Sequence, residues 1–145
     1  MRPFTHGVGQ PVDVRVAVSG GALLAIDYGY ADTQTGETLQ AVRRHAYADP
    51  LDLPGETDLS AHVDFGALAE TARKAGLTVA PLTTQGAFLT RLGIVERATA
   101  LSRANPGLAA EIERATDRLT GKNQMGELFK VFCAHSPGLA PQGFA

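Results

Sequence analysis

The sequence predicts an α/β fold in which helices cover a sheet. Apolar runs of strand length alternate with segments of helical periodicity, and this alternation is typical of layered α/β proteins. Residues 22–28 form a nearly continuous apolar run between glycines, which predicts a strand buried on both faces. The chain has 145 residues, of which 44% are hydrophobic, so it is long enough to bury a core.

The first eighteen residues predict little regular structure. Prolines and glycines interrupt any period, although valines at positions 12, 14, 16 and 18 alternate as they would in a short strand. We therefore expect three parts: an irregular lead-in over residues 1–18, a main domain over residues 19–135, and a flexible, Pro/Gly-rich tail over residues 136–145.

The middle of the chain predicts an arm, a helix and a strand. Residues 38–47 fit a short strand or an irregular arm. Asp64 is a suitable N-cap for a helix that carries one apolar stripe and ends near Ala75, where Gly76 suits a left-handed C-cap. Residues 77–82 predict a strand that lies at an edge or ends near Pro81, because proline has no N–H to donate.

The last third predicts two helices and a final strand. Residues 85–103 are helical in pattern, with a break at Gly93, and Asn105-Pro106 predicts the N-cap and first turn of a helix through Leu119. The last strand spans residues 128–134. Four apolar positions of the second helix are expected to face inward: Leu108, Ile112, Ala115 and Leu119.

Charge and composition exclude several classes of function. The net charge is −2 and the signs are interspersed, so no basic face for nucleic acid is expected. No apolar stretch is long enough to cross a bilayer and no signal peptide precedes the domain, so we expect no membrane partner and a cytoplasmic location. Cys133 is the single cysteine and lies in an apolar run, which predicts a buried core residue rather than a disulfide or zinc ligand.

The Asp27-Tyr28-Gly29 step is the first candidate site. It ends the predicted central strand, and ligands of open α/β sheets bind outside the carboxyl ends of strands. Asp27 could hold an amine or guanidinium and Tyr28 could stack on it. In the competing interpretation, Asp27 only caps backbone N–H groups at the turn.

His62 and Asp64 form the second candidate. Both precede the helix that starts after Asp64, and carboxylates are favoured at a helix start, so capping is the preferred role of Asp64. His62 fits equally well as a base, as a polar substrate contact, or as a donor to a backbone carbonyl.

No other catalytic motif is complete. The four histidines lack metal-ligand spacing, and neither a nucleophile elbow nor a P-loop occurs. Gly7-Val8-Gly9 predicts a turn rather than a cofactor loop, because no apolar strand precedes it and no acid follows at the expected distance. We therefore assign no catalytic residue, no metal site and no cofactor-binding residue.

Ungapped blocks over roughly residues 20–134 resemble one family, the MidA-like methyltransferases, which includes the arginine methyltransferase that serves in mitochondrial complex I assembly. The first block is Gly20-Gly21 followed by apolar residues and Asp27-Tyr28-Gly29. The later blocks follow in the family's order. They are Thr38–Arg43 with His45, Asp49–Leu51, Pro54-Gly55, Asp58–Phe65, Thr84–Gly86 with Phe88-Leu89, Leu92–Ile94 with Arg97, and Met125–Val131.

The resemblance implies a partial class I, Rossmann-like methyltransferase fold. The run over residues 22–28 would be its fifth strand, the segments 77–82 and 128–134 its last two, and the final strand would run antiparallel beside the fifth. The complete family enzyme uses S-adenosyl-L-methionine and methylates protein arginine. Its cofactor half would lie upstream, so we expect no cofactor on this chain alone, and residues 1–18 fall outside the resemblance.

Three functions are compared. The leading one is the C-terminal part of a methyltransferase linked to respiratory complex assembly, inactive without its cofactor half, with Asp27, Tyr28, His62 and Asp64 as candidate substrate-binding residues. The second is a non-catalytic protein-binding or assembly module, in which an exposed sheet edge also permits self-association. The third, a stand-alone enzyme of unknown chemistry, ranks lowest because no catalytic set is complete.

Overall fold

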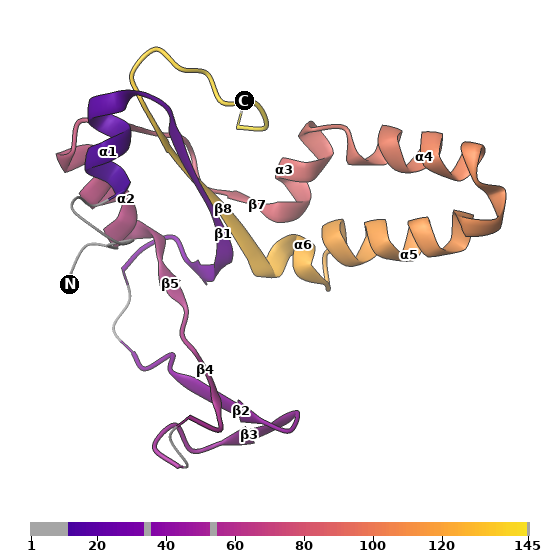
Figure 1. Cartoon of the computed structure of the whole chain (residues 1–145), viewed down its shortest axis with the longest axis horizontal. Coiled ribbons are helices and arrows are strands. Elements are labelled where there is room, and N and C mark those ends of the chain that lie inside the picture. Colours follow the sequence, from indigo (N-terminus) through magenta and orange to yellow (C-terminus); the bar gives the residue numbers. More distant parts are fainter. Residues whose placement is uncertain (1–11, 34–35, 53–54, 145) are drawn as a thin grey trace.

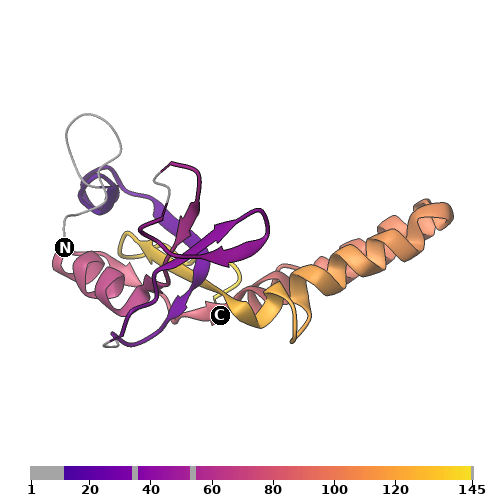
Figure 2. The ribbon, with the colours of Figure 1, turned by 90° about the horizontal axis from the view of Figure 1, so that it is seen from below.

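The structure is a computed structural model and describes residues 12–33, 36–52 and 55–144. Helices pack against a central mixed sheet, a small three-stranded sheet lies beside it, and a helical hairpin projects away from it (Figures 1 and 2). The predicted α/β architecture is confirmed. The elements are α1 Val12–Ser19, β1 Ala22–Tyr30, β2 Gln40–Arg43, β3 Ala46–Ala48, β4 Asp58–Ser60, β5 Val63–Asp64, α2 Phe65–Lys74, β6 Thr78–Val79, β7 Thr83–Thr84, α3 Gln85–Arg91, α4 Ile94–Ala104, η1 Pro106–Leu108, α5 Ala109–Thr120, α6 Met125–Leu128 and β8 Phe129–His135.

Strand β1 organises the central sheet, whose order is β5-β1-β8-β6, with β7 also paired to β8. Strand β8 runs antiparallel to β1 from Ala22↔His135 to Tyr28↔Phe129, which confirms the antiparallel neighbour expected for this strand. The parallel strand β5 meets β1 only where Gly29 and Tyr30 pair with Val63 and Asp64. Among the described residues, one edge of β1 therefore has no strand partner from Ala22 to Tyr28.

The approach of β5 to β1 explains why glycine stands at position 29. A Cβ atom on Gly29 would lie 2.1 Å from the carbonyl oxygen of Val63, well inside van der Waals contact. The two strands can approach this closely only because residue 29 has no side chain.

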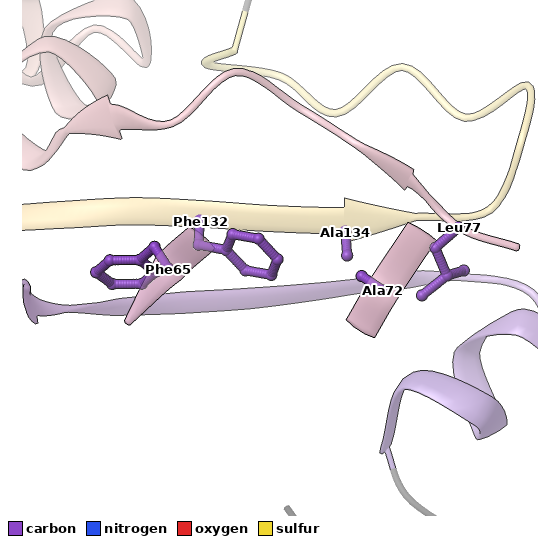
Figure 3. Close-up of a cluster of buried hydrophobic side chains, with 5 residues drawn as sticks. All are labelled: Phe65, Ala72, Leu77, Phe132 and Ala134. Atoms are coloured by element: carbon purple, nitrogen blue, oxygen red, sulfur yellow. The ribbon is translucent and has the colours of Figure 1, made fainter. Parts of the chain in front are cut away.

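The main hydrophobic core lies between this sheet and helix α2. The side chains of Phe65 and Phe132 stack with ring centroids 6.1 Å apart (Figure 3). The neighbouring Cys133 is 2% exposed, as predicted, and burial raises the pKa of its thiol above the ordinary value. The buried members of the cluster are Phe65, Ala72, Leu77, Phe132 and Ala134.

Strand β1 is buried on only one face, so the prediction of burial on both faces is wrong for this chain. Leu23 and Ala25 pack against the core cluster, whereas Leu24 and Ile26 point to the other face and are 49% and 42% exposed. Helices α1 and α2 cover the first face, and no described element covers the second at these positions.

The predicted ends of α2 and the predicted break at Gly93 are confirmed. Asp64 accepts a hydrogen bond from the Ala67 N–H at 2.8 Å and caps α2. At the other end Gly76 has φ +84°, and the N–H groups of Gly76 and Leu77 close the last turn onto the carbonyls of Arg73 and Ala72. The predicted break at Gly93 separates α3 from α4.

Two predicted strands differ in the structure. Residues 12–19 form helix α1, not the strand suggested by alternating valines; in the helix Val16 reaches the core and Val18 stays 78% exposed. The segment 77–82 forms the two-residue strand β6, which is shorter than predicted. As predicted, it lies at an edge of the sheet and ends before Pro81.

The ambiguous segment 38–47 is a strand rather than an irregular arm. It contributes β2 and part of β3, and β4 completes a small antiparallel sheet of order β3-β2-β4. The turn between β2 and β3 places Arg44 and His45 at φ 49° and 64°. Tight hairpins require positive φ at these two positions, and glycine or asparagine is the usual residue there, so arginine and histidine did not indicate a hairpin turn.

Helices α4 and α5, joined by the short turn η1, form a hairpin that we call the arm (residues 94–120). The arm packs on α3 and α6 at its base, and its tip extends away from the sheet (Figures 1 and 2). Two predictions fail here. Asn105 does not cap the following helix, because its side-chain amide donates to the Leu101 carbonyl. The expected inward residues lack a core to face: Leu108, Ala115 and Leu119 are exposed and Ile112 is half-buried.

The C-terminal tail lies against α3. The rings of Phe144 and Phe88 are 5.1 Å apart, and an Arg91 guanidinium nitrogen donates to the Gly143 carbonyl. The turn predicted at Gly7-Val8-Gly9 lies outside the described residues. Within the described ranges, no helix has the length and apolar character needed to cross a membrane.

Candidate functional site

A pocket of about 730 Å³ opens at the carboxyl end of β1. Residues from β1, from the turn before β5 and from the continuous stretch that runs from the end of α5 through α6 to the start of β8 contribute to it. Its lining is Tyr28, Gly29, His62, Arg118, Lys122, Asn123, Gln124, Met125, Glu127, Leu128 and Lys130.

Tyr28 is held at the wall of this pocket by two aromatic neighbours. Its ring makes edge-on contacts with His62 and with Phe129, each at a centroid distance of 5.6 Å. Phe129 is the cross-strand partner of Tyr28 on β8. The main-chain N–H of His62 donates to the Thr38 hydroxyl at 3.2 Å. The structure therefore brings together two of the four predicted site residues, Tyr28 and His62.

Asp27 does not line the pocket. Its cross-strand partner Lys130 is among the lining residues, but Asp27 itself is not. Its carboxylate accepts the main-chain N–H of Tyr28 at 2.8 Å, inside β1 rather than at the turn after it.

Asp64 is also outside the pocket. Its Oδ1 accepts both the Ala67 N–H and the Thr33 hydroxyl, at 2.8 and 3.1 Å. The side chain therefore ties the start of α2 to the segment that follows β1, and it supports the site only by fixing this junction.

The electrostatic character of the pocket could not be foreseen from local motifs. Three cations, Arg118, Lys122 and Lys130, line it together with one carboxylate, Glu127. Lys130 donates to the Glu127 main-chain carbonyl. The ion pairs within 4 Å in the described part of the chain are Arg43–Glu56 and Lys74–Glu70, so none of the pocket cations is paired with a carboxylate.

The cations were missed because they lie about ninety residues or more from Tyr28 along the chain and reach its pocket only through the packing of the elements that carry them. Arg118 ends α5, Lys122 lies in the turn before α6, and Lys130 lies on β8 opposite Asp27. The family resemblance implied that the strand carrying Lys130 runs antiparallel beside β1, but not the register that sets Lys130 opposite Asp27.

A site for a nucleotide cofactor needs a glycine-rich turn between a strand and a helix, and an acid at the end of the next strand. The described residues contain two strand-to-helix junctions, β5 to α2 and β7 to α3, and these are capped by Asp64 and Thr84 instead. Asp27 accepts the main-chain N–H of Tyr28. No group of three or more potential metal ligands occurs in the described ranges.

Comparison with known proteins agrees with the sequence resemblance. The family described as "Putative S-adenosyl-L-methionine-dependent methyltransferase" matches residues 10–83, just over half of the chain. This match starts ten residues before Gly20, so the expectation that the segment before residue 18 lies wholly outside the resemblance is wrong.

Curated relatives are similar over most of this chain. The mitochondrial protein arginine methyltransferase NDUFAF7 of Danio rerio is 36% identical over 85% of the chain, and that of Homo sapiens is 35% identical over 81%. The chain spans only 29% and 27% of the length of these two relatives.

Solved structures give the same result. A Burkholderia thailandensis protein of uncharacterised function superposes with a TM-score of 0.75 and 28% identity, over 92% of this chain and 36% of that one. A second structure from the same organism, with bound S-adenosyl-homocysteine, gives a TM-score of 0.72 over 35% of its length. From the family match and these similarities together, this chain belongs to the S-adenosyl-L-methionine-dependent methyltransferase family that includes the NDUFAF7 arginine methyltransferases.

Proposed function

We propose that this chain forms the acceptor side, the part that binds the protein substrate, of a methyltransferase that modifies protein arginine. It transfers no methyl group unless further residues hold the cofactor. In this proposal β1, β8 and β6 are the fifth and last two strands of a class I methyltransferase sheet. The part that binds S-adenosyl-L-methionine would add strands along the unpaired edge of β1.

One observation supports this proposal most strongly: the pocket lies beside that unpaired edge. Tyr28 ends the stretch of β1 that has β8 on one side and no described strand on the other, and it lines the pocket. Ligands of open α/β sheets bind outside the carboxyl ends of the strands. A cofactor held by additional strands next to β1 would therefore lie close to Tyr28.

The pocket chemistry suggests how an arginine would be held. S-adenosyl-L-methionine supplies the methyl group, and the acceptor nitrogen must be held in line with it. The Tyr28 ring offers a stacking surface for a guanidinium, and the Glu127 carboxylate offers a bidentate acceptor. The three unpaired cations favour acidic residues on either side of the target arginine.

The test is reconstitution with the missing part supplied separately. This chain is mixed with the portion of the Danio rerio relative that it does not match, and transfer of labelled methyl groups to protein arginine is measured. We expect transfer only from the mixture. The Tyr28→Ala and His62→Ala variants should lower the rate by about tenfold or more, because positioning contacts in the pocket would be lost.

Tyr47→Ala is the matched control, since Tyr47 is 82% exposed on β3 and does not line the pocket. Its rate should equal that of the unmodified chain. If the mixture binds the cofactor but all three substitutions change the rate of methyl transfer equally, the assignment of this pocket as the arginine-binding site is contradicted. Methyl transfer by the chain alone would contradict the need for a separate cofactor part.

A non-catalytic binding module is the second candidate, and the projecting arm is the observation that favours it. Such a module would bind its partner equally well with and without the cofactor part. The reconstitution assay separates the two functions, because a binding module gives no methyl transfer in any mixture.

A further inference from the structure

The arm carries an apolar stripe whose spacing reads the same in both directions along the helix. Leu108, Ile112, Ala115 and Leu119 are separated by four, three and four residues. At 100° per residue, these positions fall on one face of α5 and of the residue that precedes it. The spacing is the 3-4 repeat with which helices pack side by side.

No described element covers this stripe. Leu108 and Leu119 are 52% and 36% exposed, Ala115 is exposed, and Ile112 is half-buried. The groove on the arm between α4 and α5 is lined by Ile112 but by none of the other three, so the stripe faces largely away from that groove. The arm extends beyond the rest of the chain, which leaves this face accessible (Figures 1 and 2).

A second copy of the same helix, placed antiparallel, matches the stripe. Reversal of a 4-3-4 spacing sets Leu108 opposite Leu119 of the other copy and Ile112 opposite Ala115. The large and small side chains of the inner pair are then complementary in volume, and the two outer leucines close each end.

The charges beside the stripe are also self-complementary. Glu111 and Arg118 lie seven residues apart on one flank, both exposed. In the register set by the stripe, antiparallel pairing brings Glu111 of each copy to Arg118 of the other, so two opposite-charge pairs form about one twofold axis. A parallel pair would instead set this flank against the opposite flank of the other copy, where Ala109 and Thr116 carry no charge.

We propose that the arm is a homodimerisation surface in which α5 pairs antiparallel with α5 of a second copy. This interface does not depend on the proposed methyltransferase activity. It also differs from pairing along the open edge of β1, because β1 carries neither Glu111 nor Arg118. Arg118 additionally lines the pocket at the base of the arm, so one end of the interface adjoins the site.

Charge reversal tests this interface without touching the core. The dissociation constant of the dimer is measured by analytical ultracentrifugation on the full chain, on Glu111→Arg, on Arg118→Glu and on the double variant. Each single reversal creates two like-charge contacts and should raise the dissociation constant about tenfold or more. The double variant restores opposite charges and should return it to within about threefold of the original.

Arg114→Glu is the matched control, because Arg114 is exposed on α5 but points away from the stripe. It should leave the dissociation constant unchanged. A chain that stays monomeric up to about 0.1 mM would overturn the proposal. So would a dimer that the single reversals do not weaken or the double variant does not restore; such a dimer uses another surface, for example the edge of β1.

Discussion

Asp64 joins three segments around the site through one side chain. Its carboxylate caps α2 through the Ala67 N–H and accepts the Thr33 hydroxyl, while its backbone continues the short strand β5 next to Tyr30. The sequence had placed Asp64 among the candidate substrate contacts and had preferred capping as its role. In the structure its hydrogen bonds are those of a cap.

We predict that Asp64→Ala lowers the free energy of unfolding by about 1 kcal/mol, the usual cost of losing a side-chain N-cap. Asp64→Asn retains an acceptor oxygen and should cost less than half as much. Urea denaturation of the three proteins checks this. Equal losses for Ala and Asn would show that the negative charge, rather than the hydrogen bond, is what matters at this position.

Residue-level features were predictable wherever the cause is local. Asp64, Gly76 and Gly93 lie at helix ends whose chemistry is decided by their immediate neighbours. The charged lining of the pocket was not predictable, because Arg118 and Lys122 reach Tyr28 only through the packing of α5 and α6 onto the sheet. Tyr28 and Arg118 are some ninety residues apart in the sequence, so no local pattern indicates that they line the same pocket.

At the scale of elements, the sequence of β1 predicts more burial of the strand than this structure shows. Its apolar run predicted burial on both faces, yet Leu24 and Ile26 remain substantially exposed. The strand itself was predicted correctly, because the run and its bounding glycines are local signals, and the family resemblance implied its antiparallel neighbour. Burial of the two faces of β1 was not predicted correctly, because burial depends on which other elements pack on each face.

This difference predicts unequal costs for core substitutions. Phe132→Ala should lower the free energy of unfolding by about 3–5 kcal/mol, as expected for a fully buried aromatic ring, and Phe132 is 2% exposed. Leu24→Ala should cost less than about 1 kcal/mol, since roughly half of the side chain is already in water. Thermal or urea unfolding of both variants measures this, and a cost above about 2 kcal/mol for Leu24→Ala would mean that its face is covered in solution.

The arm gives a second case at the same scale. The break at Gly93 and the end of α5 were predicted correctly, but the start of α5 was not. The stripe of Leu108, Ile112, Ala115 and Leu119 was assigned to an interior that the described chain does not supply. Amphipathic spacing predicts that a helix face will be covered. It does not identify whether the cover comes from the same chain.

For the molecule as a whole, the open edge of β1, its exposed apolar face and the pocket beside them have a common explanation. Each would be completed by further strands of a methyltransferase domain, and the chain spans less than a third of the length of the NDUFAF7 relatives that it resembles. The central claim is that the acceptor side is present here, while the cofactor side is not formed by these residues.

Titration calorimetry with S-adenosyl-L-methionine on the folded chain alone tests this claim most directly. Circular dichroism first establishes that the chain is folded under the conditions used. The account predicts no saturable heat up to about 1 mM cofactor, because affinity weaker than this corresponds to less than about 4 kcal/mol of binding free energy. Saturable binding in the micromolar range would show that these residues hold the cofactor by themselves, and would contradict the account.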